Sequence, residues 1–144
     1  MTTNVIDSPS GWVKKHIDSY VETGGAEGHL WRGVPTLLLT TVGRRSGNRH
    51  RTALIYGRDG ADYVLVASQG GAPKNPNWYL NLAANPEVEV QVGDDVFTAT
   101  AHTADEATRA RLWPRMAEIW PDYDAYQAKT DRQIPVIVLR RTQP

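Results

Sequence analysis

The chain has 144 residues and a formal net charge of zero, because 16 lysines and arginines are matched by 16 aspartates and glutamates. This length is typical of one domain with its own hydrophobic core. The absence of cysteine excludes disulfides, thiolate nucleophiles and cysteine-ligated metal sites. The balanced charge argues against a general nucleic-acid-binding protein.

The sequence contains neither a candidate transmembrane helix nor a secretory signal. Its longest apolar run, "YVLVA" at 63–67, is far shorter than the roughly 18 to 20 residues that cross a bilayer. The first residues, "MTTNVIDSPSG", lack the basic start and apolar centre of an export signal. We therefore expect a cytoplasmic protein, and a reducing cytoplasm fits the absence of cysteine.

An amphipathic helix is expected between Pro9 and Gly24, before the glycine-containing segment "TGGAEGH". Its apolar residues at helical spacing are Trp12, Val13, Ile17, Tyr20 and Val21. Two interpretations are open: the helix packs on the rest of the domain over a substrate pocket, or it rests on a membrane surface, which Lys14 and Lys15 permit.

From Pro35 onward, short β-branched runs separated by turn residues indicate an antiparallel sheet or barrel. Six strands are expected, near 36–42, 52–57, 63–68, 88–92, 96–102 and 135–140. The segments "RDGAD" and "GDD" have the composition of hairpin turns.

The segment "KNPNWYLNLAANP" predicts a helix inserted between two of these strands. We expect Asn75 to cap it, Pro76 to occupy its first position, and Asn85-Pro86 to end it.

A further helix is predicted after the fifth strand. Thr103 and Glu106 have the spacing of a capping box, and Pro114 is expected to kink or restart the helix. A short helix carrying Tyr123 and Tyr126 is expected before the last strand.

The segment "GRRSGNRHRT", 43–52, joins two predicted strands and holds four arginines, Arg44, Arg45, Arg49 and Arg51. Crowded like charges repel unless they are solvated apart or share an anionic partner. The rest of the chain is acidic, so the positive charge is local and indicates a discrete anionic ligand. The alternative is a solvated basic turn.

A second segment favours the anionic ligand. "SQGGAPKNPNW" passes from a strand through two glycines and Lys74 into a helix N-terminus, whose free N–H groups attract negative charge. Together the two segments favour a phosphate-bearing cofactor. Neither G-x-x-x-x-G-K-[ST] nor G-x-G-x-x-G is present, so ATP and NAD are not the leading ligands.

Three segments in order, "GRRSGNRHRTALIYGRDG", "VASQGGAPKNPNWYLNLAANPEVEVQV" and "WPDYDAYQAKTDRQIPVIVLRR", resemble the deazaflavin-dependent nitroreductase family over about residues 28–141. The resemblance implies a mainly β, α+β fold: a six-stranded antiparallel split β-barrel with flanking helices, related to the flavin-binding pyridoxamine-oxidase-like barrels. It implies one domain over 1–144, with the helix and linker in 1–27 and the barrel in 28–144. It also implies reduced coenzyme F420 as the cofactor.

In this family the basic loop grips the phosphate and oligoglutamate tail of the deazaflavin. Members commonly have arginine at the position of His50, so Arg49 or Arg51 is expected to supply that charge. By position, the resemblance implies that the cofactor contacts Arg44, Arg45, Ser46, His50, Arg51, Thr52, Ala53, Leu54, Ile55, Val66, Ala67, Ser68, Gln69, Lys74, Asn77, Trp78, Tyr79, Leu80 and Asn81.

A reduced deazaflavin donates a hydride, so the protein must position an acceptor and stabilise or protonate the charge left on its oxygen. Quinones, nitroaromatics and activated enones fit this scheme. Tyrosine is a neutral O–H donor near pH 7. The alternative is that the aromatic residues are ordinary core, which we prefer for Trp113. The candidates at the acceptor end are Tyr123, Tyr126, Ser68 and Trp120, with Tyr56 and Trp78 beside them.

The predicted function is an F420H2-dependent oxidoreductase that transfers hydride to a quinone-like or nitroaromatic acceptor. The alternatives are an FMN-binding oxidase of the pyridoxamine-oxidase-like group and a non-catalytic F420 carrier; a nucleic-acid module ranks last. Histidine spacing does not indicate a metal site. Asp131 and Arg132 are expected to form a structural pair or a helix exit. The physiological acceptor and the oligomeric state stay open.

Overall fold

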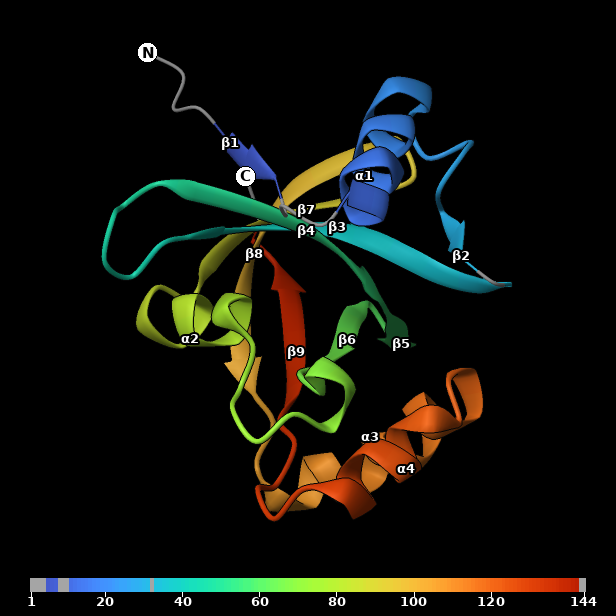
Figure 1. Cartoon of the computed structure of the whole chain (residues 1–144), viewed down its shortest axis with the longest axis vertical. Coiled ribbons are helices and arrows are strands. Elements are labelled where there is room, and N and C mark those ends of the chain that lie inside the picture. The colour runs from blue at the N-terminus through green and yellow to red at the C-terminus, as the bar shows by residue number, and fades with distance from the viewer. Residues whose placement is uncertain (1–4, 8–10, 32, 143–144) are drawn as a thin grey trace.

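The computed structural model describes residues 5–7, 11–31 and 33–142, and its centre is a strongly curled β-sheet (Figure 1). Nine strands of the described residues form this sheet, in the order β1-β4-β3-β7-β8-β9-β6-β5, with β2 paired to β3. Every pairing is antiparallel except that of β1 with β4. The strands are β1 (Val5–Asp7), β2 (Leu30–Trp31), β3 (Val34–Val42), β4 (Arg49–Ile55), β5 (Gly57–Asp59), β6 (Asp62–Val66), β7 (Glu87–Val92), β8 (Asp95–Thr103) and β9 (Val136–Arg141).

The curled sheet is split along one line. Around the curl the paired strands run β4, β3, β7, β8, β9 and β6. Among the described residues, no hydrogen-bonded ladder joins β4 to β6 and closes the barrel. The predicted split barrel is thereby confirmed, and all six predicted strands are present. The prediction missed β1, β2 and β5, because runs of two or three residues are too short to show alternation.

The helices pack around this sheet (Figure 1). They are α1 (Gly11–Thr23), α2 (Asn77–Ala84), α3 (Glu106–Ile119) and α4 (Asp122–Lys129), with a 3₁₀ turn η1 (Gln69–Gly71). None of the helices in the described ranges combines the length and the apolar character that crossing a membrane requires.

The run of three leucines in β3 explains how the sheet is covered on two faces. Successive strand residues point to opposite faces. Leu37 and Leu39 belong to the core inside the curl, whereas Leu38 packs on the other face with Ile17 and Tyr20 of α1. A third cluster of buried apolar residues lies between the sheet and the helices α3 and α4.

Helix α1 packs on the sheet, as the first interpretation of its apolar face expects. Ile17 and Tyr20 are fully buried. The Tyr20 hydroxyl donates to the Thr36 carbonyl at 3.0 Å and accepts from the Gly93 N–H at 2.7 Å, so the helix is tied to β3 and to the β7–β8 turn. Val21 is 43% exposed, and the side chain of Trp12 lies outside the described part of the structure.

The start predicted for α2 is wrong in detail. Asn75 does not cap it; Pro76 occupies the N-cap position and the helix begins at Asn77. The Asn75 side chain instead accepts a hydrogen bond from Arg132. The predicted end holds, because Asn85 is the C-cap residue and precedes Pro86.

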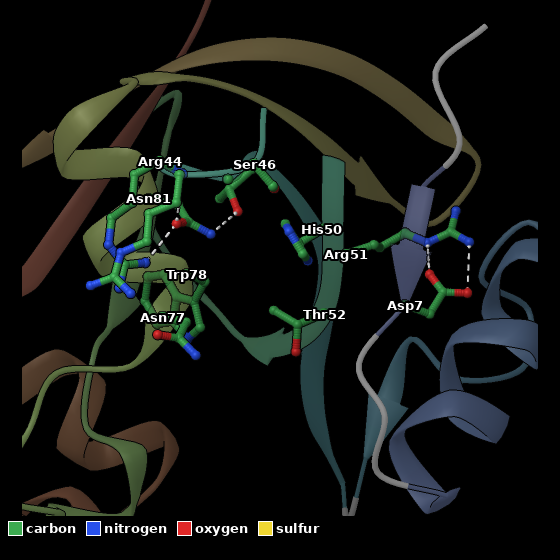
Figure 2. A pocket seen from close by; sticks show the side chains of 12 residues that line it. Asp7, Arg44, Ser46, His50, Arg51, Thr52, Asn77, Trp78 and Asn81 are labelled. Atoms are coloured by element: carbon green, nitrogen blue, oxygen red, sulfur yellow. Dashed lines mark hydrogen bonds and ion pairs between the residues drawn. The ribbon is translucent and has the colours of Figure 1, made fainter. Parts of the chain in front are cut away.

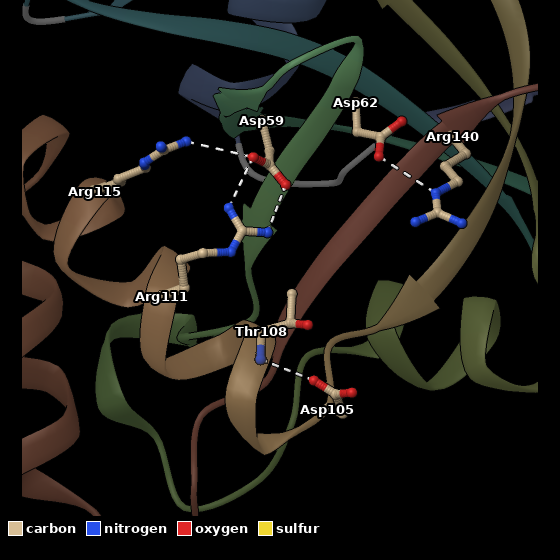
Figure 3. A network of polar contacts seen from close by, with 7 residues as sticks. All are labelled: Asp59, Asp62, Asp105, Thr108, Arg111, Arg115 and Arg140. Carbon is tan, nitrogen blue, oxygen red and sulfur yellow. Dashed lines mark hydrogen bonds and ion pairs between the residues drawn. The ribbon is translucent and has the colours of Figure 1, made fainter.

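The predicted capping box of the next helix is also wrong. Thr103 ends strand β8, and Asp105 caps α3 by accepting the Thr108 N–H at 2.8 Å (Figure 3). A short side chain that hydrogen-bonds the next turn suits either position, so spacing alone could not choose between them. Helix α3 continues through Pro114 and does not restart there.

Exposed ion pairs fasten the β5–β6 hairpin to its neighbours (Figure 3). Asp59 accepts hydrogen bonds from both terminal nitrogens of the Arg111 guanidinium, each at 2.9 Å. Asp62 pairs with Arg140 on β9. The hydrogen bonds from Arg111 lower the pKa of Asp59. Such exposed pairs fix geometry more than they stabilise the fold.

Replacing Asp105 by Ala should lower the midpoint of thermal unfolding by about 2 to 4 °C, whereas Asp105→Asn should leave it unchanged, because Asn caps a helix as well as Asp. The hydrogen bond from the Thr108 N–H lowers the pKa of Asp105. The difference between wild type and the Ala variant should therefore persist above about pH 4 and vanish as the pH falls through the lowered pKa. Scanning calorimetry at several pH values measures this; equal midpoints for the Ala and Asn variants at pH 7 would exclude the cap.

Candidate active site

Two adjoining cavities lie along strand β4, and Trp78 of α2 lines both. One has a volume of about 560 Å³ and is lined by Asp7, Thr41, Gly43, Arg44, Arg45, Ser46, His50, Arg51, Thr52, Asn77, Trp78 and Asn81. The other has a volume of about 360 Å³ and is lined by His16, Trp31, Thr36, Ala53, Leu54, Ile55, Val66, Ser68, Gln69, Gly70, Pro76, Trp78, Trp120, Tyr123 and Tyr126. We call them the basic cavity and the split cavity.

The β3–β4 turn shapes the basic cavity (Figure 2). The turn is closed by hydrogen bonds from Gly43 N–H to the Asn48 carbonyl and from Gly47 N–H to the Gly43 carbonyl. A Cβ atom at Gly43 would lie 2.7 Å from the Ser46 hydroxyl oxygen and 3.0 Å from His50 Nε2. A side chain at this position would displace the Ser46 hydroxyl and the His50 ring, and both of these residues line the cavity.

Asn81 connects this turn to helix α2 (Figure 2). Its side-chain oxygen accepts from the Arg44 backbone N–H at 3.2 Å and from the Arg44 guanidinium at 2.9 Å, and its amide donates to Thr41 at 3.3 Å. Asn81 is buried, so these hydrogen bonds also satisfy its polar atoms. The turn and the helix therefore form one wall of the basic cavity.

Two of the four arginines are already paired within the chain. Arg51 donates to both oxygens of Asp7 at 2.7 and 3.1 Å, and Arg49 pairs with Glu89 at 2.9 Å. Both lie on β4, which begins at Arg49 and not at the predicted Thr52. Arg49 does not line the basic cavity. Arg44, Arg45 and Arg51 line it, and their predicted contacts with the cofactor stay predictions.

Asp7 contributes to the basic cavity, although no pattern in the sequence predicted it as a site residue. It lines the basic cavity and pairs with Arg51 (Figure 2). It also accepts a hydrogen bond from Lys14 at 3.2 Å. Its burial alone would raise the pKa of this carboxyl, but the hydrogen bonds and charges of Arg51 and Lys14 outweigh burial and lower it. Asp7 therefore stays an anion near neutral pH and compensates the charge of Arg51.

The positive charge left in the basic cavity comes from Arg44, Arg45 and the start of α2. Among the described residues the Arg45 side chain has no hydrogen bond or ion pair, and the backbone N–H groups of Asn77 and Trp78 have no acceptor. Such N–H groups at the positive end of a helix attract anions. The cavity thus offers unused donors to an anionic ligand.

The split cavity occupies the line where β4 and β6 are not paired. Ala53, Leu54 and Ile55 of β4 face it from one side and Val66 of β6 from the other. Among the described residues β1 pairs β4 only as far as Arg51, so the outer backbone edge of β4 beyond that point has no strand beside it. No charged side chain of the described residues lines this cavity.

Aromatic side chains close the split cavity from the helical side. Trp120 contacts Trp31, with ring centroids 5.3 Å apart, and its indole N–H donates to the Tyr126 hydroxyl at 3.4 Å. Tyr123 is buried against Tyr126, and this burial raises the pKa of its hydroxyl. The Tyr123 hydroxyl therefore stays neutral near pH 7 and can donate a hydrogen bond.

Two other aromatic residues do not line either cavity. Trp113 packs behind Tyr123 and donates to Asp124, which agrees with the core interpretation. Tyr56 is buried in the core inside the curl, where its hydroxyl contacts His29 Nε2 at 2.8 Å. The expectation that Tyr56 lies at the acceptor end gains no support from the two cavities and stays a prediction.

Arg132 holds the segment 67–75 that forms one rim of the split cavity. Its guanidinium donates to the carbonyls of Ala67, Ser68 and Ala72 and to the Asn75 side chain, at 2.7 to 3.3 Å. Arg132 lies just after the end of α4, which agrees with the expected helix exit. Among the described residues it does not pair with Asp131. Its planar five-donor group explains how one side chain fixes four acceptors.

Most predicted site residues line one of the two cavities. Those that line neither are Ala67, Lys74, Tyr79 and Leu80, whose predicted cofactor contacts stay predictions. Sequence reasoning missed Asp7, His16, Trp31, Thr36, Thr41, Gly43, Gly70 and Pro76 as lining residues. The first three come from the N-terminal 31 residues, and no local motif connects them with the cavities.

A comparison with protein-family models identifies the chain. The family described as F420H(2)-dependent quinone reductase matches residues 12–141. The chain belongs to this family. A curated relative agrees: the F420H(2)-dependent quinone reductase of Mycobacterium tuberculosis strain H37Rv is 41% identical over 145 residues, which cover 92% of this chain and 97% of the relative.

Two solved structures share the fold. An F420-H2 dependent reductase is 42% identical, with a TM-score of 0.69, and the match covers 74% of this chain and 94% of that one. A structure described as a domain-swapped dimer is 39% identical, with a TM-score of 0.71, covering 92% of this chain and all of that one. The resemblance seen in the sequence, the fold class and the oxidoreductase class are confirmed, and reduced F420 is the cofactor of the family.

Replacing Gly71 by Ala should destabilise the protein more than replacing Gly70 by Ala. Both glycines have a positive φ, which costs an alanine about 1 kcal/mol or more. An added Cβ at Gly71 would also lie 2.6 Å from the Tyr126 carbonyl oxygen, whereas nothing lies within 4 Å at Gly70. Denaturant unfolding measures the two losses; equal losses would show that contact between this segment and α4 does not constrain the split cavity.

Proposed function

We propose that this chain transfers a hydride from reduced F420 to a quinone-like or nitroaromatic acceptor, with the cofactor tail in the basic cavity and the acceptor in the split cavity. The observation that carries the proposal is the joining of a cation-lined cavity to an uncharged, aromatic cavity at Trp78. A cofactor with an acidic tail and a flat ring needs both environments side by side.

The free donors of the basic cavity suit the phosphodiester and glutamates of the tail. Arg45 and the N–H groups at the start of α2 would bind these anions, and Arg44 can do so while it holds Asn81. Arg51 would contribute less, because Asp7 already compensates its charge. The tail therefore supplies affinity through few, well-placed donors and not through a general excess of positive charge.

The ring would be placed by β4 and the rim of the split cavity. The backbone edge of β4 beyond Arg51 has free hydrogen-bonding groups, and Leu54, Ile55 and Val66 offer apolar surface. When bound, the reduced deazaflavin supplies the hydride itself. The protein holds donor and acceptor close together and excludes water from the space between them.

The acceptor would lie against Trp31, Trp120 and the tyrosines of α4. A quinone or nitro group gains negative charge on an oxygen when it receives hydride, and a neutral hydroxyl can stabilise that charge by donating a hydrogen bond. Tyr123, Tyr126 and Ser68 carry the hydroxyl groups that line this cavity together with Thr36. Donors that a bound acceptor shields from water act more strongly than donors in water.

Helix α1 supports this function by covering the split cavity. His16 lines that cavity, and Ile17 and Tyr20 fix the helix to the sheet. Lys14 already pairs with Asp7 and Asp18, so binding to an anionic membrane surface would compete with contacts inside the protein. Covering the cavity is therefore the better supported of the two interpretations of this helix.

Replacing Arg45 by Ala should weaken binding of F420, because it removes a charged donor that makes no other contact. Losing one charge-assisted hydrogen bond should cost about 1.5 to 3 kcal/mol of binding free energy. Arg115→Ala removes the same charge from an exposed site on α3 outside both cavities and should bind F420 like wild type. Fluorescence titration of the cofactor measures both. Equal affinity for Arg45→Ala and Arg115→Ala would contradict the placement of the tail.

Adding a quinone to wild-type protein and reduced F420 should cause rapid oxidation of the cofactor, which its absorbance reports. A panel of quinones, nitroaromatics and enones then ranks the acceptors. Titration with FMN in parallel tests the oxidase alternative, and we expect FMN to bind more weakly than F420. Tight FMN binding with weak F420 binding would contradict the proposal, and tight F420 binding without turnover of any acceptor would indicate a carrier.

A further inference from the structure

We propose that the imidazole of His16 is the proton donor to the acceptor oxygen in the split cavity. This inference rests on the proposed function, since it concerns the same cavity and the same acceptor. It assigns a catalytic role to helix α1, which otherwise serves as a cover.

His16 is held in the wall of the split cavity by contacts on several sides. Its Nε2 lies 2.6 Å from the Gly28 carbonyl oxygen, and its ring stacks on Tyr20 with centroids 6.4 Å apart. A Cβ atom at Gly28 would lie 3.2 Å from the ring, so glycine at this position allows the close approach. The imidazole is therefore fixed before any ligand binds.

The hydrogen bond to Gly28 also decides which ring nitrogen exchanges a proton. A carbonyl oxygen can only accept, so Nε2 carries hydrogen in both charge states. The Thr36 hydroxyl donates to the same carbonyl at 2.6 Å. His16 Nε2 also lies 3.4 Å from that hydroxyl. Nδ1 has no hydrogen-bond partner among the described residues, so it is the ring nitrogen that is free to exchange a proton with a ligand.

The other groups around this cavity are poor acids. Tyr123 and Tyr126 are its other titratable lining residues, and burial raises the pKa of Tyr123. Tyr20 faces His16 from the same helix, and burial raises its pKa as well. No charged side chain of the described residues lines the cavity from β4, β6, η1, α3 or α4. Imidazole is the side-chain group that ordinarily gives up a proton near neutral pH.

The proton transfer follows the hydride transfer. A quinone that receives a hydride gains two electrons and one hydrogen and becomes the monoanion of a hydroquinone. The N–H bond at His16 Nδ1 breaks, and its proton bonds the anionic oxygen to give the neutral hydroquinone. The neutral imidazole then takes a proton from water. The cofactor, which has lost a hydride, releases one proton to water when it leaves in its oxidised form, so the protons balance.

A binding experiment on the ligand-free protein tests this assignment without turnover. The ligand is 2-hydroxy-1,4-naphthoquinone, which is an anion over the pH range used and resembles the charged product. Quenching of tryptophan fluorescence reports binding, because Trp31, Trp78 and Trp120 line the split cavity. Wild type should bind about tenfold more weakly near pH 8 than near pH 5.5, since a cationic imidazole attracts the anion and a neutral one does not.

His16→Gln should remove this pH dependence. The Gln side-chain amide reaches the place of Nε2 and can keep the hydrogen bond to Gly28, but it does not titrate. His16→Asn provides a second variant if His16→Gln folds poorly. His102→Gln, on an exposed part of β8, should behave like wild type. A pH dependence that persists without His16 and disappears in His50→Gln, in the basic cavity, would overturn the proposal.

Kinetics provide the second measurement. In wild type, kcat should fall as the pH rises, because a neutral imidazole has no Nδ1 proton to give. In His16→Gln it should be about a hundredfold lower near pH 6 and flat with pH, with the affinity for F420 unchanged. The loss should grow with the basicity of the product anion across a quinone series. A wild-type pH profile in His16→Gln would overturn the proposal, whereas inactive wild-type protein would contradict the proposed function itself.

Discussion

The structure depends on one missing interaction: β4 and β6 lie at the two sides of a curled sheet but do not pair with each other. A closed barrel of this size would fill its interior with side chains. Here the opening leaves a backbone edge on β4, an apolar wall on β6, and room for α1, α3 and α4 to place His16, Trp120 and Tyr126 at one cavity. The reaction we propose takes place in the space that strand pairing would otherwise occupy.

Charge pairing within the chain determines the rest of the site. The four arginines around the β3–β4 turn form a cluster in sequence, but Asp7 and Glu89 compensate the two that lie on β4. The donors that stay available are Arg45, partly Arg44, and the N–H groups at the start of α2. This division places positive charge at the tip of the turn and at one helix end, where an anionic tail can reach it outside the split cavity.

The two walls of the split cavity are coupled to each other. Arg132 fastens the segment 67–75 through four acceptors, and Gly71 lets the same segment lie against the backbone of Tyr126. Ser68 and Gln69 on one wall are thus fixed relative to the tyrosines of α4 on the other. A catalytic cavity needs this kind of preorganisation, because misplacing donor and acceptor by a fraction of an ångström costs rate.

The sequence by itself determined the split barrel, its six long strands, the helices, the basic turn and the family, because these follow from alternation, helical spacing and motifs a few residues apart. It also indicated the aromatic residues of α4. Tertiary structure alone decided which arginines are free, that Asp105 caps α3, that Arg132 holds the cavity rim, and that His16 and Trp31 reach the split cavity. The partners in these contacts lie up to 65 residues apart, as in the pair Arg132 and Ala67, and no local pattern records a contact that exists only once the sheet has curled.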